Sequence, residues 1–301
     1  MKNKNDEVKL ECSKCTHGNI FLRALGNPID SWYRLLLACF LFIGVYYFLR
    51  EASSILFDLF LTNFISGTAS LNPIYESRFT DWLIFMFVPS IMSAYYIVYK
   101  SSPKLLISIK PGFRWGWFIR CLVIVAPISG ILIIGQSALE MESELVFSNF
   151  TISSVLITVV MSFLQSAGEE FVFRAGSLQI FSTVIKSNKW AWILLCTLIS
   201  IIFALMHNPN NFSATLYLFA TSLLMFVLVY YTGGIEASIV LHSANNLFLN
   251  LLTDFSNIEV DFNASSHFSG GDLMGNLVVI GLNAAITLLV MFMWNRYQKK
   301  V

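Results

Sequence analysis

The sequence predicts an all-α, polytopic membrane protein, a helical bundle of about eight transmembrane helices. Two observations lead to this prediction. Of the 301 residues, 56% are hydrophobic and only 12% are charged, whereas a soluble domain carries roughly 25% charged residues. The hydrophobic residues also fall into runs of about 20, the length that a helix needs to cross the hydrocarbon core.

Each apolar run of this length is expected to form a membrane span. The predicted spans are 33–50, 80–99, 115–137, 150–186, 189–207, 212–232, 235–253 and 273–294. The stretch 52–66 is apolar but contains Asp58 and Asn63, so it is expected to form an interfacial helix. The fourth run is too long for one simple crossing and must tilt, kink or project beyond the bilayer, with Gly168 and Gly176 as candidate positions.

The distribution of Lys and Arg predicts cytoplasmic termini, because cytoplasmic loops are rich in these residues. With the N-terminus inside, the cytoplasmic segments hold Lys2, Lys4, Lys9, Lys14, Arg23, Lys100, Lys104, Lys110, Arg114, Lys186, Lys189, Arg296, Lys299 and Lys300. Only Arg50 and Arg78 are then assigned to the outer loops. The chain is thus predicted to be a multi-pass protein of the cell membrane, embedded in the lipid bilayer. No basic tract indicates a nucleic-acid partner.

The chain is expected to divide into four regions along its length. These are a cytoplasmic tail at 1–32, a transmembrane region with the interfacial helix at 33–145, a helical core at 146–255, and an outer loop with the last span at 256–301. Cys12, Cys15 and His17 in the tail could supply part of a zinc site, but a closed site would need ligands from another chain. A reduced, flexible tail is the simpler expectation.

Ionisable residues inside predicted spans mark candidate functional sites, since charges are costly in lipid. The first set is Glu169, Glu170 and Arg174. Residues four apart share a helix face, whereas neighbours point about 100° apart, so Glu170 is placed to pair with Arg174. Glu169 has no cation so placed on its own helix, and a carboxylate of this kind suits a general base. We therefore expect Glu170 to have a structural role and Glu169 to act as a general base.

Two further sets of polar residues lie on later spans. Glu169 and His207 are each about 25 Å along their helices from the turn that joins them, so the hairpin can bring them to one depth. His242 and Asn246 share a helix face and can both donate to one oxygen, as stabilisation of an oxyanion requires. Taken singly, each set could be an interhelical hydrogen bond or packing contact. Counted from Gly234, His242 is only about 12 Å along its helix, shallower than the other two.

These residues resemble the motifs of the CPBP family of intramembrane proteases, which includes CAAX proteases, bacteriocin-processing enzymes and Abi-like proteins. The family is marked by EExxxR, FxxxH and HxxxN on successive membrane helices, and these motifs occur here at 169–174, 203–207 and 242–246. The resemblance covers roughly 150–253. It implies an eight-helix bundle around a central polar cavity of conical shape. It also implies that the helical core at 146–255 is catalytic and that the protein hydrolyses a peptide bond inside the membrane.

The resemblance also implies a role for each motif residue. Glu169 would activate water, His207 would help to hold that water, and His242 with Asn246 would form the oxyanion hole. The paired carboxylate and arginine of the first motif would give structural support. The expected substrate is a membrane-associated peptide or protein end, either a prenylated tail or the leader of a bacteriocin or pheromone precursor.

Several alternatives to this interpretation stay open. It requires no cofactor, but Glu169, His207 and His242 are also chemically adequate zinc ligands with an open fourth position. The absence of a His-Glu-x-x-His sequence favours glutamate-activated water. An ion- or proton-coupled transporter could use the same buried residues, although no pair of broken helices in matching halves is evident. A non-catalytic bacteriocin immunity or binding protein could keep the same scaffold.

Overall fold

The computed structural model describes residues 32–64, 73–109, 112–140, 151–181, 185, 189–209, 211–255 and 273–299. Within these residues the chain is helical, without a β-strand, as predicted. The elements are α3 (Trp32–Phe64), α4 (Pro73–Phe85), α5 (Phe87–Tyr99), η2 (Pro103–Leu106), α6 (Trp115–Glu140), α7 (Ile152–Glu170), η4 (Phe171–Gly176), α8 (Ser177–Phe181), α9 (Lys189–Met206), α10 (Phe212–Thr232), α11 (Glu236–Phe255) and α12 (Leu273–Gln298). The predicted tail with Cys12, Cys15 and His17 lies outside the described residues.

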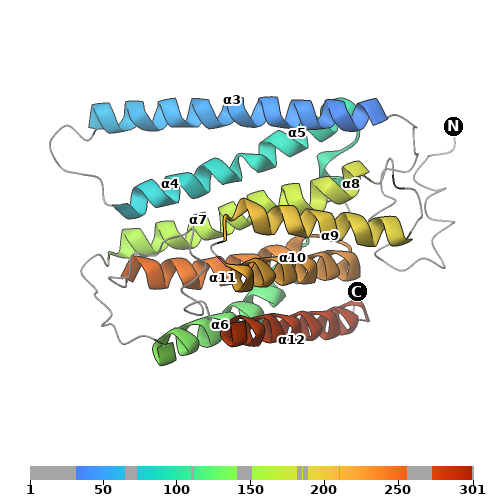
Figure 1. Cartoon of the computed structure of the whole chain (residues 1–301). Helices are drawn as coiled ribbons and strands as arrows, with labels where there is room; N and C mark the ends of the chain where they lie inside the picture. The colour runs from blue at the N-terminus through green and yellow to red at the C-terminus, as the bar shows by residue number, and fades with distance from the viewer. Residues whose placement is uncertain are drawn as a thin grey trace.

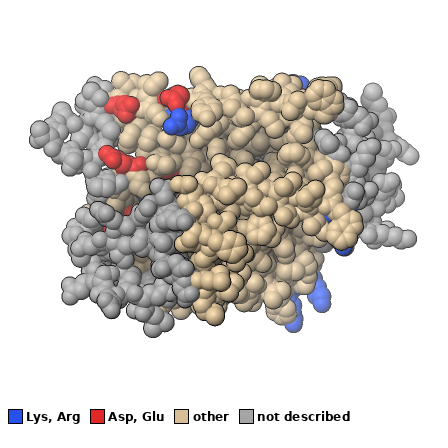
Figure 2. Space-filling model, in the orientation of Figure 1, with Lys and Arg blue, Asp and Glu red and all other residues tan. Residues whose placement is uncertain are grey.

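The long helices run alongside one another in one bundle, with α3 along one edge and α6 and α12 along the opposite edge (Figure 1). Seven described segments are long and apolar enough to cross a membrane. On the face shown in Figure 2, a wide band without Lys, Arg, Asp or Glu separates the charged side chains near its two ends. The chain is therefore an integral, multi-pass membrane protein.

The predicted span at 235–253 corresponds to α11, which is too polar to count among those seven segments. This 20-residue helix packs between α6 and α7 inside the bundle (Figure 1), so its polar side chains are shielded from lipid by neighbouring helices. Residues 232–240, which include the turn before α11, are all buried. Backbone hydrogen bonds from Ile109 to Gly233 and from Ile235 to Ile107 hold this turn beneath the preceding loop. Because α11 begins below the surface, His242 reaches a greater depth than residue counting indicated.

Two expectations for the first half of the chain are wrong. The segment 52–64 is not a separate interfacial helix but the continuation of α3, which runs unbroken for 33 residues. No Gly or Pro lies between residues 52 and 64, and an Asp inside a helix carries only a modest propensity cost. The second span starts earlier than predicted, at Ile74, and is broken at Met86. Pro89 explains the break, since it has no N–H to offer the carbonyl four residues before it.

Arg78 lies in a span rather than in an outer loop as predicted. It is 2% exposed on α4, and the carboxylates of Asp81 and Asp254 lie 2.8 and 3.8 Å from its guanidinium. Asp254 in turn accepts a hydrogen bond of 2.6 Å from Thr158. A buried arginine is tolerated in lipid when paired acids offset its charge, and those acids come partly from a helix distant in sequence.

The long fourth run is interrupted by a π-helix, η4, between α7 and α8. The two glycines that we singled out lie near its ends and allow close helix packing. A Cβ atom at Gly168 would lie 2.5 Å from the carbonyl oxygen of Ile84, and one at Gly176 would lie 2.8 Å from the Ile91 side chain. Single π turns inside α-helices are frequent at functional sites, and this one begins directly after Glu170.

Polar side chains pair along the whole contact between α7 and α11. The pairs advance by four residues on both helices, which run antiparallel. They are Thr158–Asp254 (2.6 Å), Ser162–Asn250 (2.9 Å), Ser166–Asn246 (3.3 Å) and Glu170–His242 (2.8 Å). Because each helix repeats its face about every four residues, this spacing places every pair in one interhelical seam. The seam fixes the register of the helices that carry the first and third motifs.

Substitution Gly168→Ala is expected to destabilise the protein, because the added Cβ meets backbone that cannot move aside cheaply. Overpacking of this kind costs about 1–3 kcal/mol, which should lower the thermal unfolding midpoint measured in detergent. Gly44→Ala on α3 is the matched control, since no described atom lies within 4 Å of its Cβ. An unchanged midpoint in Gly168→Ala would show that α4 does not pack this closely on α7.

Candidate active site

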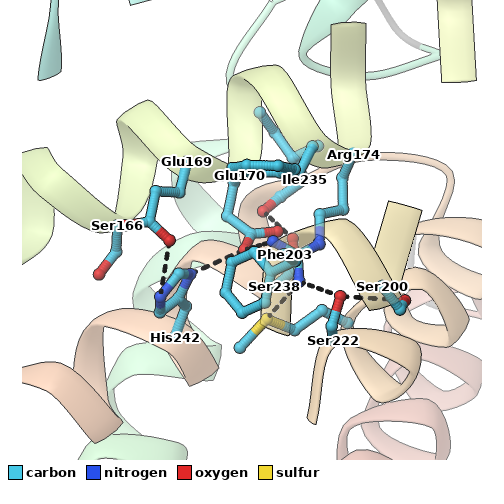
Figure 3. Close-up of polar contacts among 12 residues, drawn as sticks. Ser166, Glu169, Glu170, Arg174, Ser200, Phe203, Ser222, Ile235, Ser238 and His242 are labelled. Carbon is cyan, nitrogen blue, oxygen red and sulfur yellow. Dashed lines mark hydrogen bonds and ion pairs between the residues drawn. The ribbon is translucent and has the colours of Figure 1, made fainter. Parts of the chain in front are cut away.

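The two carboxylate oxygens of Glu169 have different surroundings at the end of α7. Glu169 is 6% exposed, and its Oε1 accepts a hydrogen bond of 2.5 Å from Gln165 Nε2. Its Oε2 has no hydrogen-bond partner among the described residues. That oxygen lies 3.8 Å from His207 Nε2 and 3.7 Å from His242 Nε2. The structure therefore brings the candidate base together with both histidines (Figure 3 shows the contact with His242).

The other ring nitrogens determine what the two histidines present to Glu169. His207 Nδ1 lies 2.7 Å from the carbonyl oxygen of Phe203, which can only accept, so Nδ1 carries the proton. His242 Nδ1 lies 2.8 Å from Glu170 Oε1 and likewise donates to an ionised carboxylate. In the neutral rings, both Nε2 atoms then hold lone pairs. Two such nitrogens thus lie near one carboxylate oxygen, at separations longer than a direct hydrogen bond. A bridging water could donate its two hydrogens to two of these three acceptors.

The predicted pair of Glu170 and Arg174 is present, with a separation of 3.0 Å and both side chains fully buried. The same Glu170 oxygen also receives the hydrogen bond from His242 (Figure 3). Glu170 therefore does more than neutralise Arg174, because it also orients the His242 ring. Carboxylates behind a histidine commonly fix the ring and its tautomer in this way.

Arg174 connects the first motif to two further helices. Its Nη2 atom donates to Ser222 Oγ on α10 at 2.9 Å, and Ser222 donates to Ser200 on α9 at 3.0 Å (Figure 3). The guanidinium also lies 4.5 Å from the ring centroid of Phe203, the residue that opens the second motif. The buried cation thus has a carboxylate, a hydroxyl and an aromatic face around it.

Asn246 and His242 share one face of α11 as predicted, but their donors have different partners on α7. Asn246 Nδ2 donates to Gln165 Oε1 at 2.7 Å and to Ser166 Oγ at 3.3 Å. His242 donates to Glu170 instead. The two groups lie near the base, while the shared oxygen position required by the oxyanion hypothesis is not defined by any contact between described residues.

Gln165 is the site residue that sequence reasoning missed. It lies on α7 one turn before Glu169 and contacts both Glu169 and Asn246. A polar residue four positions before the candidate base was the available signal, because it shares the helix face of that base.

The zinc alternative is not supported by the geometry. Among the described residues, no three His, Cys, Asp or Glu side chains are grouped so that they could hold a metal ion. The candidate ligands Glu169, His207 and His242 are close together but do not form such a group.

A separate cavity of about 640 Å³ lies between α3, α4 and α7. Its walls are mainly apolar and aromatic, with Phe57, Phe79 and Trp82 among them, and Arg78 also lines it. Met161, two turns before Glu169 on α7, belongs to the wall as well. The cavity therefore lies on the side of α7 that faces α3 and α4, and its lining reaches to within about two helical turns of Glu169.

Residues 151–248 match the Rce1-like family, whose description is type II CAAX prenyl endopeptidase Rce1-like. The match begins at the first residue before α7 and ends within α11, so it includes all the motif residues and Gln165. Comparisons with curated proteins and with solved structures gave no match.

Substitution Glu170→Gln should destabilise the protein strongly, because it leaves the fully buried Arg174 without its counter-charge. Breaking a buried pair by removing one partner costs about 3–5 kcal/mol. The measurement is the thermal unfolding midpoint in detergent. Glu51→Gln is the matched control, because it removes a carboxylate from an ion pair that is 61% exposed on the Glu side and should change little. Equal midpoints for the two variants would contradict the structural role of Glu170.

Proposed function

Since the segment 151–248 belongs to the Rce1-like family of proteases, we propose that the chain is an intramembrane endopeptidase that hydrolyses a peptide bond with a glutamate-activated water. One observation carries this proposal. The buried Oε2 of Glu169 faces the Nε2 atoms of His207 and His242 at 3.8 and 3.7 Å. A water molecule that donates its two hydrogens to Glu169 Oε2 and His207 Nε2 would keep its lone pairs free to attack a substrate carbonyl carbon.

Glu169 is proposed as the general base. As the water oxygen bonds to the carbonyl carbon, one water proton passes to Glu169 Oε2. The second hydrogen stays on the attacking oxygen and donates a hydrogen bond to His207 Nε2, which orients the water. The tetrahedral intermediate then expels the amine, and Glu169 returns its proton to that nitrogen. The products are a new carboxyl terminus and a free amino terminus, with no net change in the enzyme.

His242 and Asn246 are proposed to stabilise the negative oxygen of the intermediate. His242 can donate from Nε2 only when both ring nitrogens carry protons, and its contact with the Glu170 carboxylate is compatible with that form. Asn246 has one N–H committed to Gln165 at 2.7 Å and a second in a long contact of 3.3 Å with Ser166. This second N–H is the one that can turn to the substrate oxygen.

We propose the C-terminal peptide of a prenylated protein as the substrate class. The matched family is described by this activity, and the cavity between α3, α4 and α7 has apolar walls that suit an isoprenoid chain. The leader of a bacteriocin or pheromone precursor remains the competing substrate. Cytoplasmic termini in the cell membrane remain predictions of the Lys and Arg distribution.

Substitution Glu169→Gln should reduce cleavage of a prenylated test peptide by about 100-fold or more, the usual contribution of a general base. The side chain keeps its size, so the unfolding midpoint in detergent should stay near that of the wild type. A parallel assay with leader peptides decides between the substrate classes. Cleavage at the wild-type rate by Glu169→Gln would exclude this residue as the base, and no cleavage by the wild type would favour a binding or immunity protein.

Removal of divalent metals should leave cleavage unchanged, because in this proposal the water is held by Glu169 and His207 alone. The assay compares purified protein before and after exhaustive chelation and dialysis. Loss of activity that returns on addition of zinc would instead support the metal alternative.

A further inference from the structure

Gln165 joins two groups of the proposed active site that do not contact each other in the structure. Its Nε2 donates to Glu169 Oε1 at 2.5 Å, and its Oε1 accepts from Asn246 Nδ2 at 2.7 Å. The side chain is 9% exposed and lies within the seam between α7 and α11. The amide nitrogen of Gln165 is thus bonded to Glu169, and its amide oxygen to Asn246.

The orientation of these amides follows from their neighbours. Ser166 Oγ donates to the carbonyl oxygen of Ser162 at 2.8 Å, so its oxygen is free to accept from Asn246. Asn246 must therefore turn its amino group toward α7, and the carbonyl oxygen of Gln165 accepts a hydrogen bond from it. The amino group of Gln165 is left for Glu169. Donation runs in one direction, from Asn246 through Gln165 to the carboxylate, and such chains strengthen their members.

Holding Oε1 determines where Oε2 points. The terminal torsion of a glutamate side chain is broad, so an unrestrained carboxylate rotates readily. With Oε1 held by Gln165, the second oxygen is directed at the histidine Nε2 atoms. On the other side, one Asn246 N–H is held by Gln165, which leaves the second N–H in its longer contact with Ser166.

We propose that Gln165 is a positioning residue for hydrolysis, which fixes the Glu169 carboxylate and the Asn246 amide in one mutual arrangement. This inference rests on the proposed function. Gln165 does not touch the reacting atoms in this mechanism. It acts through the base on one side and through the oxyanion donor on the other, so it affects the chemical step more than substrate binding.

A purely structural role for Gln165 is the alternative, since it also belongs to the polar seam. Asn250 provides the matched control for that role. Its Nδ2 donates to Ser162 Oγ at 2.9 Å across the same two helices, it is 6% exposed, and it lies one turn beyond Asn246 on α11. Loss of this hydrogen bond weakens the seam without touching Glu169.

The test compares Gln165→Met with Asn250→Leu, two replacements of similar shape without hydrogen bonds. Gln165→Met should lower kcat for the test peptide by about 10- to 100-fold, the range for a lost hydrogen bond to a charged group, with KM little changed. Asn250→Leu should lower the unfolding midpoint to a similar extent but keep the wild-type kcat.

The outcomes separate this inference from the proposed function. If the wild type cleaves and Glu169→Gln does not, a wild-type kcat in Gln165→Met overturns the positioning role alone. An equal loss of kcat in Asn250→Leu also overturns it, because the effect would then belong to the seam as a whole. If the wild type cleaves no peptide, or Glu169→Gln retains full activity, the proposed function fails and this inference fails with it.

Discussion

The hydrogen bond between Glu170 and His242 is the contact on which the arrangement of the site depends. It joins α7 to α11 at 2.8 Å, deep in the bundle, and the same carboxylate oxygen lies 3.0 Å from Arg174. One buried carboxylate therefore offsets a buried cation and also sets the tautomer of a histidine. With Nδ1 held by Glu170, the His242 Nε2 atom lies 3.7 Å from Glu169 Oε2. The two carboxylates, Glu169 and Glu170, thus have distinct surroundings, although they are adjacent in the chain.

Lipid explains why the surrounding polar groups are arranged as a continuous seam. A polar side chain in the hydrocarbon region is costly unless it is paired, and the interface of α7 with α11 pairs Ser, Thr, Asn and Asp side chains at every turn. The seam runs from the candidate active site to the ionic cluster of Arg78, Asp81 and Asp254. It makes α11 more polar than the seven segments that are apolar enough to cross a membrane. The polarity that sets this helix apart from the other spans also fixes its register against Glu169 and Glu170 of the candidate active site.

Much of the site was predictable because its residues repeat at helical spacing within single segments. The pairing of Glu170 with Arg174 follows from a separation of four residues, and the meeting of Glu169 with His207 follows from equal distances to one turn. Gln165 was missed although it lies four residues before Glu169, because its other partner, Asn246, comes from a different helix. Arg78 was assigned to a loop for a similar reason, since its second acid, Asp254, comes from a distant segment.

The sequence by itself determined that the chain is an α-helical membrane protein, where most of its spans lie, and which residues belong to the family motifs. These depend on composition and on spacing along one helix, which are local properties. Only the tertiary structure decided that α3 continues unbroken, that α11 starts below the surface, and that Asn246 donates to Gln165 rather than to a position shared with His242. The physical reason is that helix ends, depth and hydrogen-bond direction are set by contacts between segments far apart in the chain. The spacing of residues along one helix shows which of them share a face, but not which face of another helix they meet.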